Sequence, residues 1–278
     1  MAWEYLEQDL QEAHFYAQRA HDLADKTKSL KDYGDACMRL GAVFIRQSLH
    51  QKAIPLFEEA IQARTQLLSE ATDEEEKFYA EINLAGAYEN LALAQYIEGD
   101  FIESSQNTVQ AIALLKSNRE VPEVAYKIAS FYNNRADVLQ MQQKLDLALI
   151  ACDSAKAFLK GLDQWADFER GRNLLIEAQI QMDFSQCGIA KDRLKQAEEY
   201  LAPYSEEAYY LLQLAVKEGI VAKCEGKIAE ALDKLNKVYP QAKEIGQTDI
   251  IQTVNSQLIE IYLQLNETDS ARSILNRQ

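Results

Sequence analysis

The sequence has little glycine and proline, with 10 Gly and 4 Pro in 278 residues. Folds rich in sheets and loops need both residues for their turns, so this scarcity disfavours such folds. No apolar run approaches the roughly 18 residues of a membrane-spanning helix, and the first residues, MAWEYLEQDL, lack the charged start and apolar core of a signal peptide. The strong helix formers Ala, Leu, Glu, Gln and Lys dominate instead, which predicts an all-α fold.

Basic residues are also scarce: 29 Lys and Arg stand against 44 Asp and Glu, for a formal net charge of −15. A nucleic-acid-binding surface needs the opposite sign, because its affinity comes largely from neutralising phosphates. An anionic membrane surface is disfavoured for the same reason. We therefore expect no direct nucleic-acid contact and no membrane contact. A neutral or basic protein partner fits the charge better, although acidity also serves solubility alone.

The common motifs of catalysis and cofactor binding are missing. The sequence contains no G-x-G-x-x-G, no phosphate-binding G-x-x-x-x-G-K-[ST], no G-x-S-x-G and no H-E-x-x-H. The three histidines, His14, His21 and His50, do not form a Cys/His ligand set, and a packing or surface role is expected for them. We therefore expect no enzymatic activity, no catalytic residue, no cofactor and no metal.

The four cysteines, Cys37, Cys152, Cys187 and Cys224, lie far apart and include no C-x-x-C pair. This spacing predicts free thiols that serve as small core residues in a reducing compartment. Together with the lack of a signal peptide, it predicts a cytoplasmic location.

One motif recurs along the chain. A small residue is followed twelve positions later by a second small residue, with a short polar break between them. The pairs are Gly41/Ala53, Ala92/Ser104, Ala136/Ala148, Ala178/Ala190, Gly219/Ala231 and, in degraded form, Ile259/Ala271. Two antiparallel helices can approach closely where small residues meet at their crossing. Because one such pair cannot bury its apolar faces alone, neighbouring pairs must stack to complete the core.

This pattern resembles the tetratricopeptide repeat (TPR) family, in the segments LGA…AIPLF, EGDF…A, ADVL…LDLAL and EGKIAEAL. The resemblance implies a right-handed superhelix, an α-solenoid of about six helix pairs behind an unpaired N-terminal helix. A single solenoid domain, 1–278, would comprise a half repeat at 1–27 and repeats at 28–70, 74–118, 122–160, 166–202, 205–240 and 247–278. Its period of about 40–44 residues exceeds the standard 34. It is similar to that of kinesin light chains, the large bacterial maltose regulator and the peptide-sensing regulators of Gram-positive bacteria.

The chain departs from the family pattern at one position. The family usually has a large apolar residue before the first small one, and Leu40 and Leu91 fit this rule. Later repeats have Arg135, Glu177 and Glu218 there instead.

Several residues mark helix boundaries. The acidic stretch at 67–78 could be a functional patch, but Asp73 as N-cap and Glu76 as its capping-box partner favour a helix start. Pro203 and Pro240 should end second helices. At the N-terminus, Trp3, Leu6 and Leu10 are expected to pack on the first full repeat.

Helical periodicity separates two faces of the first helix in each repeat. Ala136 and Leu139 must face the partner helix, which places Asn133 and Asp137 on a neighbouring stripe. In TPR arrays this stripe lines the concave groove, where the amides of Asn can pair with a peptide backbone. The resemblance therefore implies a peptide-binding set of Asn90, Tyr96, Asn133, Asn134, Asp137, Gln140, Arg172, Gln179, Gln213 and Lys217. The alternative is that Asn133 and Asp137 are merely solvated polar residues or bond the next repeat.

The function expected is non-catalytic binding of a protein or peptide ligand in the concave groove. Within that class the nearest resemblance is to a peptide-responsive regulator of the Gram-positive type, without an effector domain because no helix-turn-helix segment precedes the array. The alternative is a structural scaffold or adaptor. Such a protein would assemble a complex through its outer surface or form a homodimer through its terminal repeats.

Overall fold

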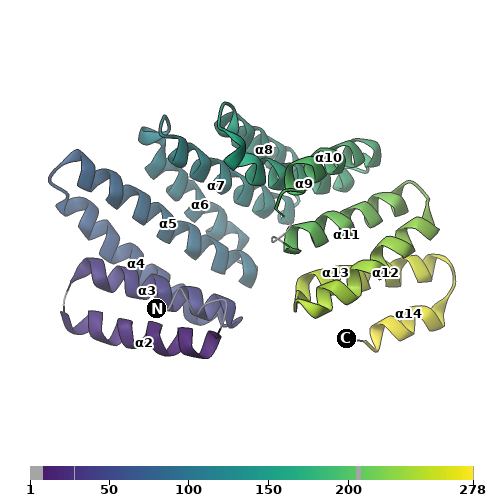
Figure 1. Cartoon of the computed structure of the whole chain (residues 1–278), viewed down its shortest axis with the longest axis horizontal. Helices are drawn as coiled ribbons and strands as arrows, with labels where there is room; N and C mark the ends of the chain where they lie inside the picture. Colours follow the sequence, from purple (N-terminus) through teal and green to yellow (C-terminus); the bar gives the residue numbers. More distant parts are fainter. Residues whose placement is uncertain (1–8, 28, 205–207, 278) are drawn as a thin grey trace. The chain divides into compact units, whose positions relative to one another are not determined.

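The computed structural model describes residues 9–27, 29–204 and 208–277. Within these ranges the chain forms thirteen α-helices and two short 3-10 helices, with no strand (Figure 1). The all-α fold is confirmed. Among these helices, none combines the length and the hydropathy that a membrane crossing needs.

The chain divides into two compact units, Met1–Lys144 and Leu145–Gln278. The helices of the first unit are α2 (Leu10–Thr27), α3 (Leu30–Arg46), α4 (His50–Glu70), α5 (Glu74–Glu98), α6 (Phe101–Leu115) and α7 (Pro122–Met141). Those of the second unit are α8 (Leu145–Leu159), α9 (Asp167–Asp183), α10 (Cys187–Leu201), α11 (Ala208–Cys224), α12 (Ile228–Glu244), α13 (Thr248–Gln264) and α14 (Thr268–Leu275). Because the contacts define two units, the single-domain organisation stays a prediction.

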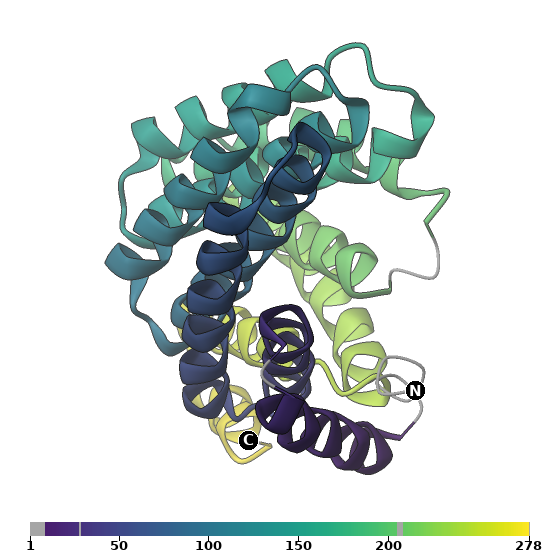
Figure 2. The same ribbon diagram turned by 90° about the vertical axis from the view of Figure 1, so that its left-hand side faces the viewer.

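Within the two units, successive helices pack as five of the six pairs that the repeat pattern predicts, and the sixth, α7 with α8, is divided between the units. In the first unit α3 packs on α4 and α5 on α6, and in the second α9 packs on α10, α11 on α12 and α13 on α14 (Figures 1 and 2). Helix α2 packs on α3 as the predicted half repeat. Leu10 on α2 lies against the core formed with α3 and α4. Trp3 and Leu6, expected beside it, lie outside the described residues.

Small residues make the close crossings within three of these pairs. A Cβ atom on Gly41 would lie 2.5 Å from the ring of Phe57, and one on Gly219 would lie 2.9 Å from Leu235. The hydroxyl of Ser104 donates a hydrogen bond of 2.8 Å to the backbone carbonyl of Ala92, its predicted partner. The recurrent small residues therefore set the helix spacing, as the sequence predicts.

Local signals explain most helix boundaries. The backbone N–H of Glu76 donates to Asp73 Oδ1 at 2.8 Å, and Glu76 accepts from the N–H of Thr72 at 2.8 Å, so the acidic stretch starts α5. Helix α10 ends at Leu201, before Pro203, as predicted. The prediction for Pro240 is wrong, because α12 continues through it to Glu244. Buried Val238 and Ala242 hold the helix on both sides of the proline, so packing offsets the one lost backbone hydrogen bond.

Candidate functional site

The first helices of the pairs are neighbours within each unit: α3, α5 and α7 in the first, α9, α11 and α13 in the second. We call the solvent-facing side of α5 and α7, and separately that of α9, α11 and α13, the first-helix surface of each unit. It corresponds to the stripe from which the sequence predicts peptide binding.

In the first unit, the three predicted asparagines have different surroundings. Asn134 on α7 donates a hydrogen bond of 2.5 Å to Glu89 Oε1 on α5, so it joins neighbouring pairs. Asn90 donates to the carbonyl of Gly86 in its own helix at 2.8 Å. Asn133 is fully buried and therefore does not reach the first-helix surface.

The remaining predicted residues of this unit, Tyr96, Asp137 and Gln140, are partly exposed. Apolar side chains accompany them: Leu93 is 44% exposed and Met141 47%. The Asn134–Glu89 bond pairs positions 45 residues apart on parallel helices, which brings Tyr96 and Met141 to the same level. The surface thus combines polar groups with accessible apolar ones.

In the second unit, predicted residues form side-chain contacts between neighbouring first helices, and we call these contacts rungs. Lys217 on α11 donates to Gln179 Oε1 on α9 at 2.9 Å. The guanidinium of Arg172 lies 5.5 Å from the ring centroid of Tyr210, again 38 positions further along the chain. The repeated interval shows that α9 and α11 run in parallel register. The side chains therefore stand at fixed positions along the surface.

The rungs continue from α11 to α13. Lys223 donates to Gln257 Oε1 at 2.8 Å and lies 2.7 Å from Glu260. The hydroxyl of Tyr209 donates to Asp249 at 2.8 Å, and burial and this hydrogen bond raise the pKa of Tyr209. The last predicted residue, Gln213, bonds the same hydroxyl.

Two of the predicted residues bond the first helix of the preceding repeat: Asn134 on α7 bonds α5, and Lys217 on α11 bonds α9. The bond of Asn134 accounts for one weak helix former inside α7, since the contact between repeats offsets its low propensity. Ligand binding by the predicted set stays a prediction.

Two glutamates that depart from the family pattern have a structural role that sequence reasoning missed. Glu177 is buried on α9 and pairs with Lys156 on α8 and with Arg193 on α10, the latter at 3.1 Å. Glu218 on α11 likewise bonds Lys234 on α12 at 2.8 Å. In these repeats an ion pair replaces the apolar contact of the large residue. The glutamates at this position of the repeat were the signal in the sequence that could have indicated these ion pairs.

A pocket of about 390 Å³ opens beside Glu177, lined among others by Lys156, Arg170 and Arg193. These three basic side chains are engaged. Lys156 and Arg193 pair with Glu177, and Arg170 donates to the carbonyls of Leu159 and Leu162 at 2.8 and 2.6 Å. Arg170 thereby caps the C-terminus of α8, which is a structural role.

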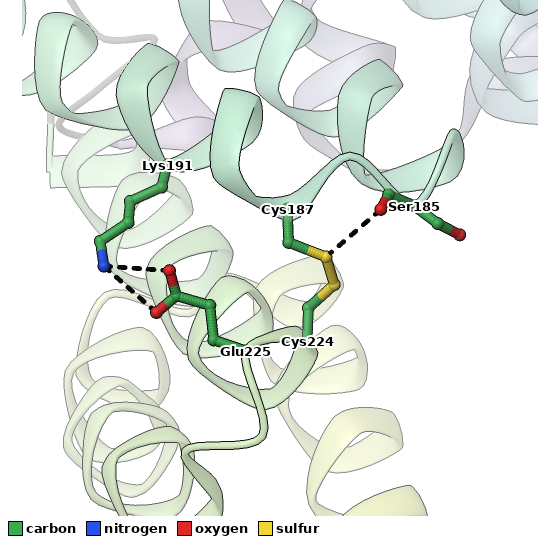
Figure 3. The surroundings of a disulfide bond; sticks show 5 residues. All are labelled: Ser185, Cys187, Lys191, Cys224 and Glu225. Carbon is green, nitrogen blue, oxygen red and sulfur yellow. Dashed lines mark hydrogen bonds and ion pairs between the residues drawn. A yellow bond between two sulfur atoms is a disulfide. The ribbon is translucent and has the colours of Figure 1, made fainter.

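The prediction that all four cysteines are free is wrong for two of them. A disulfide joins Cys187, the first residue of α10, to Cys224, the last residue of α11, with the Cα atoms 6.1 Å apart (Figure 3). Helix ends that meet in space are far apart in sequence, so spacing alone did not reveal the pair. Beside it, Lys191 Nζ lies 3.0 and 3.1 Å from the carboxylate oxygens of Glu225 (Figure 3). Hydrogen bonds from Lys227 and Lys191 lower the pKa of Glu225.

The other two cysteines, Cys37 and Cys152, are free and buried, as predicted. Cys37 does not lie among apolar groups alone. His21 and Glu59 approach it from α2 and α4, a Cys/His/Glu cluster that the sequence analysis did not anticipate. Burial and the charge of Glu59 raise the pKa of Cys37 to about 12.

No family model matches the sequence, and neither does any curated protein. Solved structures do match, and they share the fold. The nearly identical TPR-like repeats of a predicted kinesin light chain from Podosopora anserina superpose with a TM-score of 0.57 at 18% identity, over 73% of this chain and 92% of that one. BtubC (BKLC) from P. vanneervenii superposes with a TM-score of 0.63 at 17% identity, over 87% of this chain and 92% of that one.

These likenesses and the packing together define the fold class: the chain is a tandem array of TPR-like helix pairs. The resemblance to kinesin light chain repeats is confirmed at the level of the fold. The resemblance to the Gram-positive peptide-sensing regulators stays a prediction.

Proposed function

We propose that the chain is a non-catalytic protein-interaction module that holds an extended peptide or partner segment on its first-helix surface. The observation that carries this proposal is the combination on α5 and α7 of fixed polar groups with the exposed apolar side chains of Leu93 and Met141. The TPR-like fold supports it, since solenoids of this kind present extended binding surfaces.

The rungs would favour binding because they restrict side-chain motion in advance. Lys217 and Asn134 are held by Gln179 and Glu89 before any ligand arrives. Less side-chain entropy is then lost on binding. Amide groups on this surface offer both donors and acceptors to a peptide backbone, and Leu93 and Met141 offer contact to apolar side chains.

A scaffold or adaptor role is the second candidate, and exposed apolar residues on a second helix favour it. Ile102 and Val109 on α6 are 63% and 38% exposed and seven residues apart, so they share one helix face. A folded partner, or a second copy of the chain, could cover this face. Both candidates are protein-interaction roles. Neither involves binding to nucleic acid or to a membrane, in keeping with the net charge of −15.

The finer predictions enter here as parts of the proposal. They are a peptide-responsive regulatory role, a homodimer through the terminal repeats and a cytoplasmic location. The buried thiols of Cys37 and Cys152 fit a reducing compartment, whereas a persistent Cys187–Cys224 disulfide is typical of an oxidising one. The redox state of Cys187 and Cys224 in protein isolated from its native source under acid quench therefore tests the location.

Selection from a phage-displayed library of random peptides tests the proposal, followed by affinity measurements on the enriched sequences. We expect Leu93→Ser and Met141→Ser to weaken binding by about tenfold each, which corresponds to about 1.4 kcal/mol of lost apolar contact. The matched controls Ile102→Ser and Val109→Ser should bind as the parent does. Equal losses of affinity in both sets of variants, or losses in the controls alone, would favour binding at the face of α6 that carries Ile102 and Val109. Either result would contradict binding at the first-helix surface.

A further inference from the structure

Three helices of the first unit bring metal-binding side chains to one point. His21 on α2, Cys37 on α3 and Glu59 on α4 each offer a ligand atom, and these atoms all lie within 4.8 Å of one another. Cys37 Sγ is 3.7 Å and His21 Nε2 is 4.0 Å from Glu59 Oε2. The sequence separates the three residues by 16 and 22 positions, so no ligand spacing is visible in it.

The imidazole of His21 presents an unsatisfied nitrogen to this point. Nε2 is inaccessible to solvent and has no hydrogen-bond partner within the described residues. Buried polar atoms almost always have a partner, because leaving one unpaired is unfavourable. Nδ1, on the other side of the ring, lies 4.0 Å from Asp22 Oδ1. The ring thus turns Nε2 toward the thiol and the carboxylate.

The carboxylate of Glu59 is oriented by a neighbour that is not a member of the triad. The hydroxyl of Tyr33 donates to Glu59 Oε2 at 2.6 Å. Tyr33 precedes Cys37 by one helical turn, so the two side chains share a face of α3. Outer hydrogen bonds of this kind fix the direction of ligand side chains in metal sites.

We propose that His21, Cys37 and Glu59 bind a Zn²⁺ ion that fastens α2 to α3 and α4. Thiolate, imidazole and carboxylate are the three side-chain types that zinc takes in proteins. Ideal tetrahedral bonds to these atoms would separate them by about 3.3–3.6 Å. The triad must therefore contract by up to about 1.5 Å, within the reach of side-chain rotation. Three protein ligands leave a fourth position for water.

Cobalt(II) is the direct probe, because a bond between cobalt and a thiolate gives a charge-transfer absorption band that cobalt bound elsewhere lacks. The chain is prepared without a histidine tag and without thiol reductant, so that Cys187 and Cys224 stay joined. We expect equimolar Co²⁺ to produce the band and excess Zn²⁺ to remove it. We also expect Zn²⁺ to raise the melting temperature and to slow hydrogen exchange in α2, since a ligand that binds only the folded state stabilises it.

Matched variants separate this site from adventitious binding. Cys37→Ser and Glu59→Gln, which largely keep the side-chain volume, should weaken metal binding about 100-fold or more, whereas Tyr33→Phe should weaken it about tenfold. His21→Gln should behave as Cys37→Ser does. His14→Gln on the same helix and Cys152→Ala in the second unit should bind the metal as the parent does.

Circular dichroism checks that each variant is folded, so a variant that unfolds is set aside and the remaining ligand variants decide. The proposal is overturned if no charge-transfer band forms with the parent chain. It is equally overturned if the band persists in folded Glu59→Gln and His21→Gln chains, or if His14→Gln removes it.

Discussion

Glu177 Oε2 on α9 lies 3.1 Å from Arg193 Nε on α10, sixteen residues further along the chain. Glu218 and Lys234 repeat this relationship at the same interval in the next pair. Both glutamates occupy the position where the TPR pattern has a large apolar residue. The second unit therefore joins the helices of these two pairs with charge, where the first unit has the buried apolar residues Leu40 and Leu91.

An apolar residue in place of Glu177 should not destabilise the chain. Glu177 is the buried member of this group, whereas the side chains of Lys156 and Arg193 are 40% and 34% exposed and stay solvated without it. Because hydrophobic replacement of a buried ion pair is often neutral or stabilising, we expect Glu177→Leu to change the free energy of unfolding by about 0 to +1 kcal/mol. Removing both cations instead, in Lys156→Ala/Arg193→Ala, leaves Glu177 buried without a partner and should cost about 3–5 kcal/mol. Urea unfolding of the three chains measures both effects. A Glu177→Leu chain less stable than the double variant would contradict this account.

The second ion pair predicts a pH dependence. The hydrogen bond to Glu218 raises the pKa of Lys234. A group whose pKa is raised by folding contributes its full stabilisation below its unfolded pKa, about 10.4 for lysine, and loses it as the pH rises through the folded value. We therefore expect the stability difference between the parent and Lys234→Met to be constant from pH 7 to 9 and to shrink above about pH 10.4. Chemical unfolding at a series of pH values measures it, and a difference that grows at high pH would exclude the pair as its source.

The glycine at the first crossing should not tolerate a methyl group. A Cβ on Gly41 would lie 2.5 Å from the Phe57 ring, so Gly41→Ala should destabilise the chain by about 1–3 kcal/mol through overpacking. Gly86 on α5 is the matched control, since a Cβ there meets no atom within 4 Å. Gly86→Ala should stabilise the chain by up to about 1 kcal/mol, because alanine is the better helix former. Thermal melts that moved both variants in the same direction would be inconsistent with this packing.

The disulfide should contribute to the stability of the second unit. Cys187 and Cys224 close a loop of 37 residues, for which chain entropy predicts about 2–4 kcal/mol. Reductant should lower the stability of the parent by that amount and leave a Cys187→Ser/Cys224→Ser chain unchanged. Alkylation of the unfolded, unreduced parent should label only Cys37 and Cys152. Labelling of all four cysteines would show that the bond is absent.

The fold was predictable from the sequence because its determinants are local and periodic. The twelve-residue spacing of Ala92 and Ser104 reappears as a hydrogen bond between the two helices. The predicted N-cap at Asp73 likewise needed only its immediate neighbours. Pro240 escaped prediction because the packing that holds α12 together around it is not local.

The candidate site was predictable only in part. Periodicity placed Lys217 and Gln179 on the corresponding stripes of two different helices. It could not show that they bond each other, since that depends on the register of α9 against α11. It also placed Asn133 on the stripe although packing buries the residue completely. The Cys187–Cys224 bond and the His21–Cys37–Glu59 cluster depend on contacts between helices, which spacing in the sequence does not encode.

Site-specific photo-crosslinking tests most directly whether the first-helix surface holds the ligand. A photoreactive amino acid is placed at Leu93 or Gln140 on this surface, and at Ile102 or Val109 on α6 as controls, in chains that bind a library-selected peptide with unchanged affinity. The account predicts covalent adducts with the peptide from positions 93 and 140 and none from 102 and 109. Adducts that form only from positions 102 and 109 would contradict the account and assign peptide binding to the exposed face of α6.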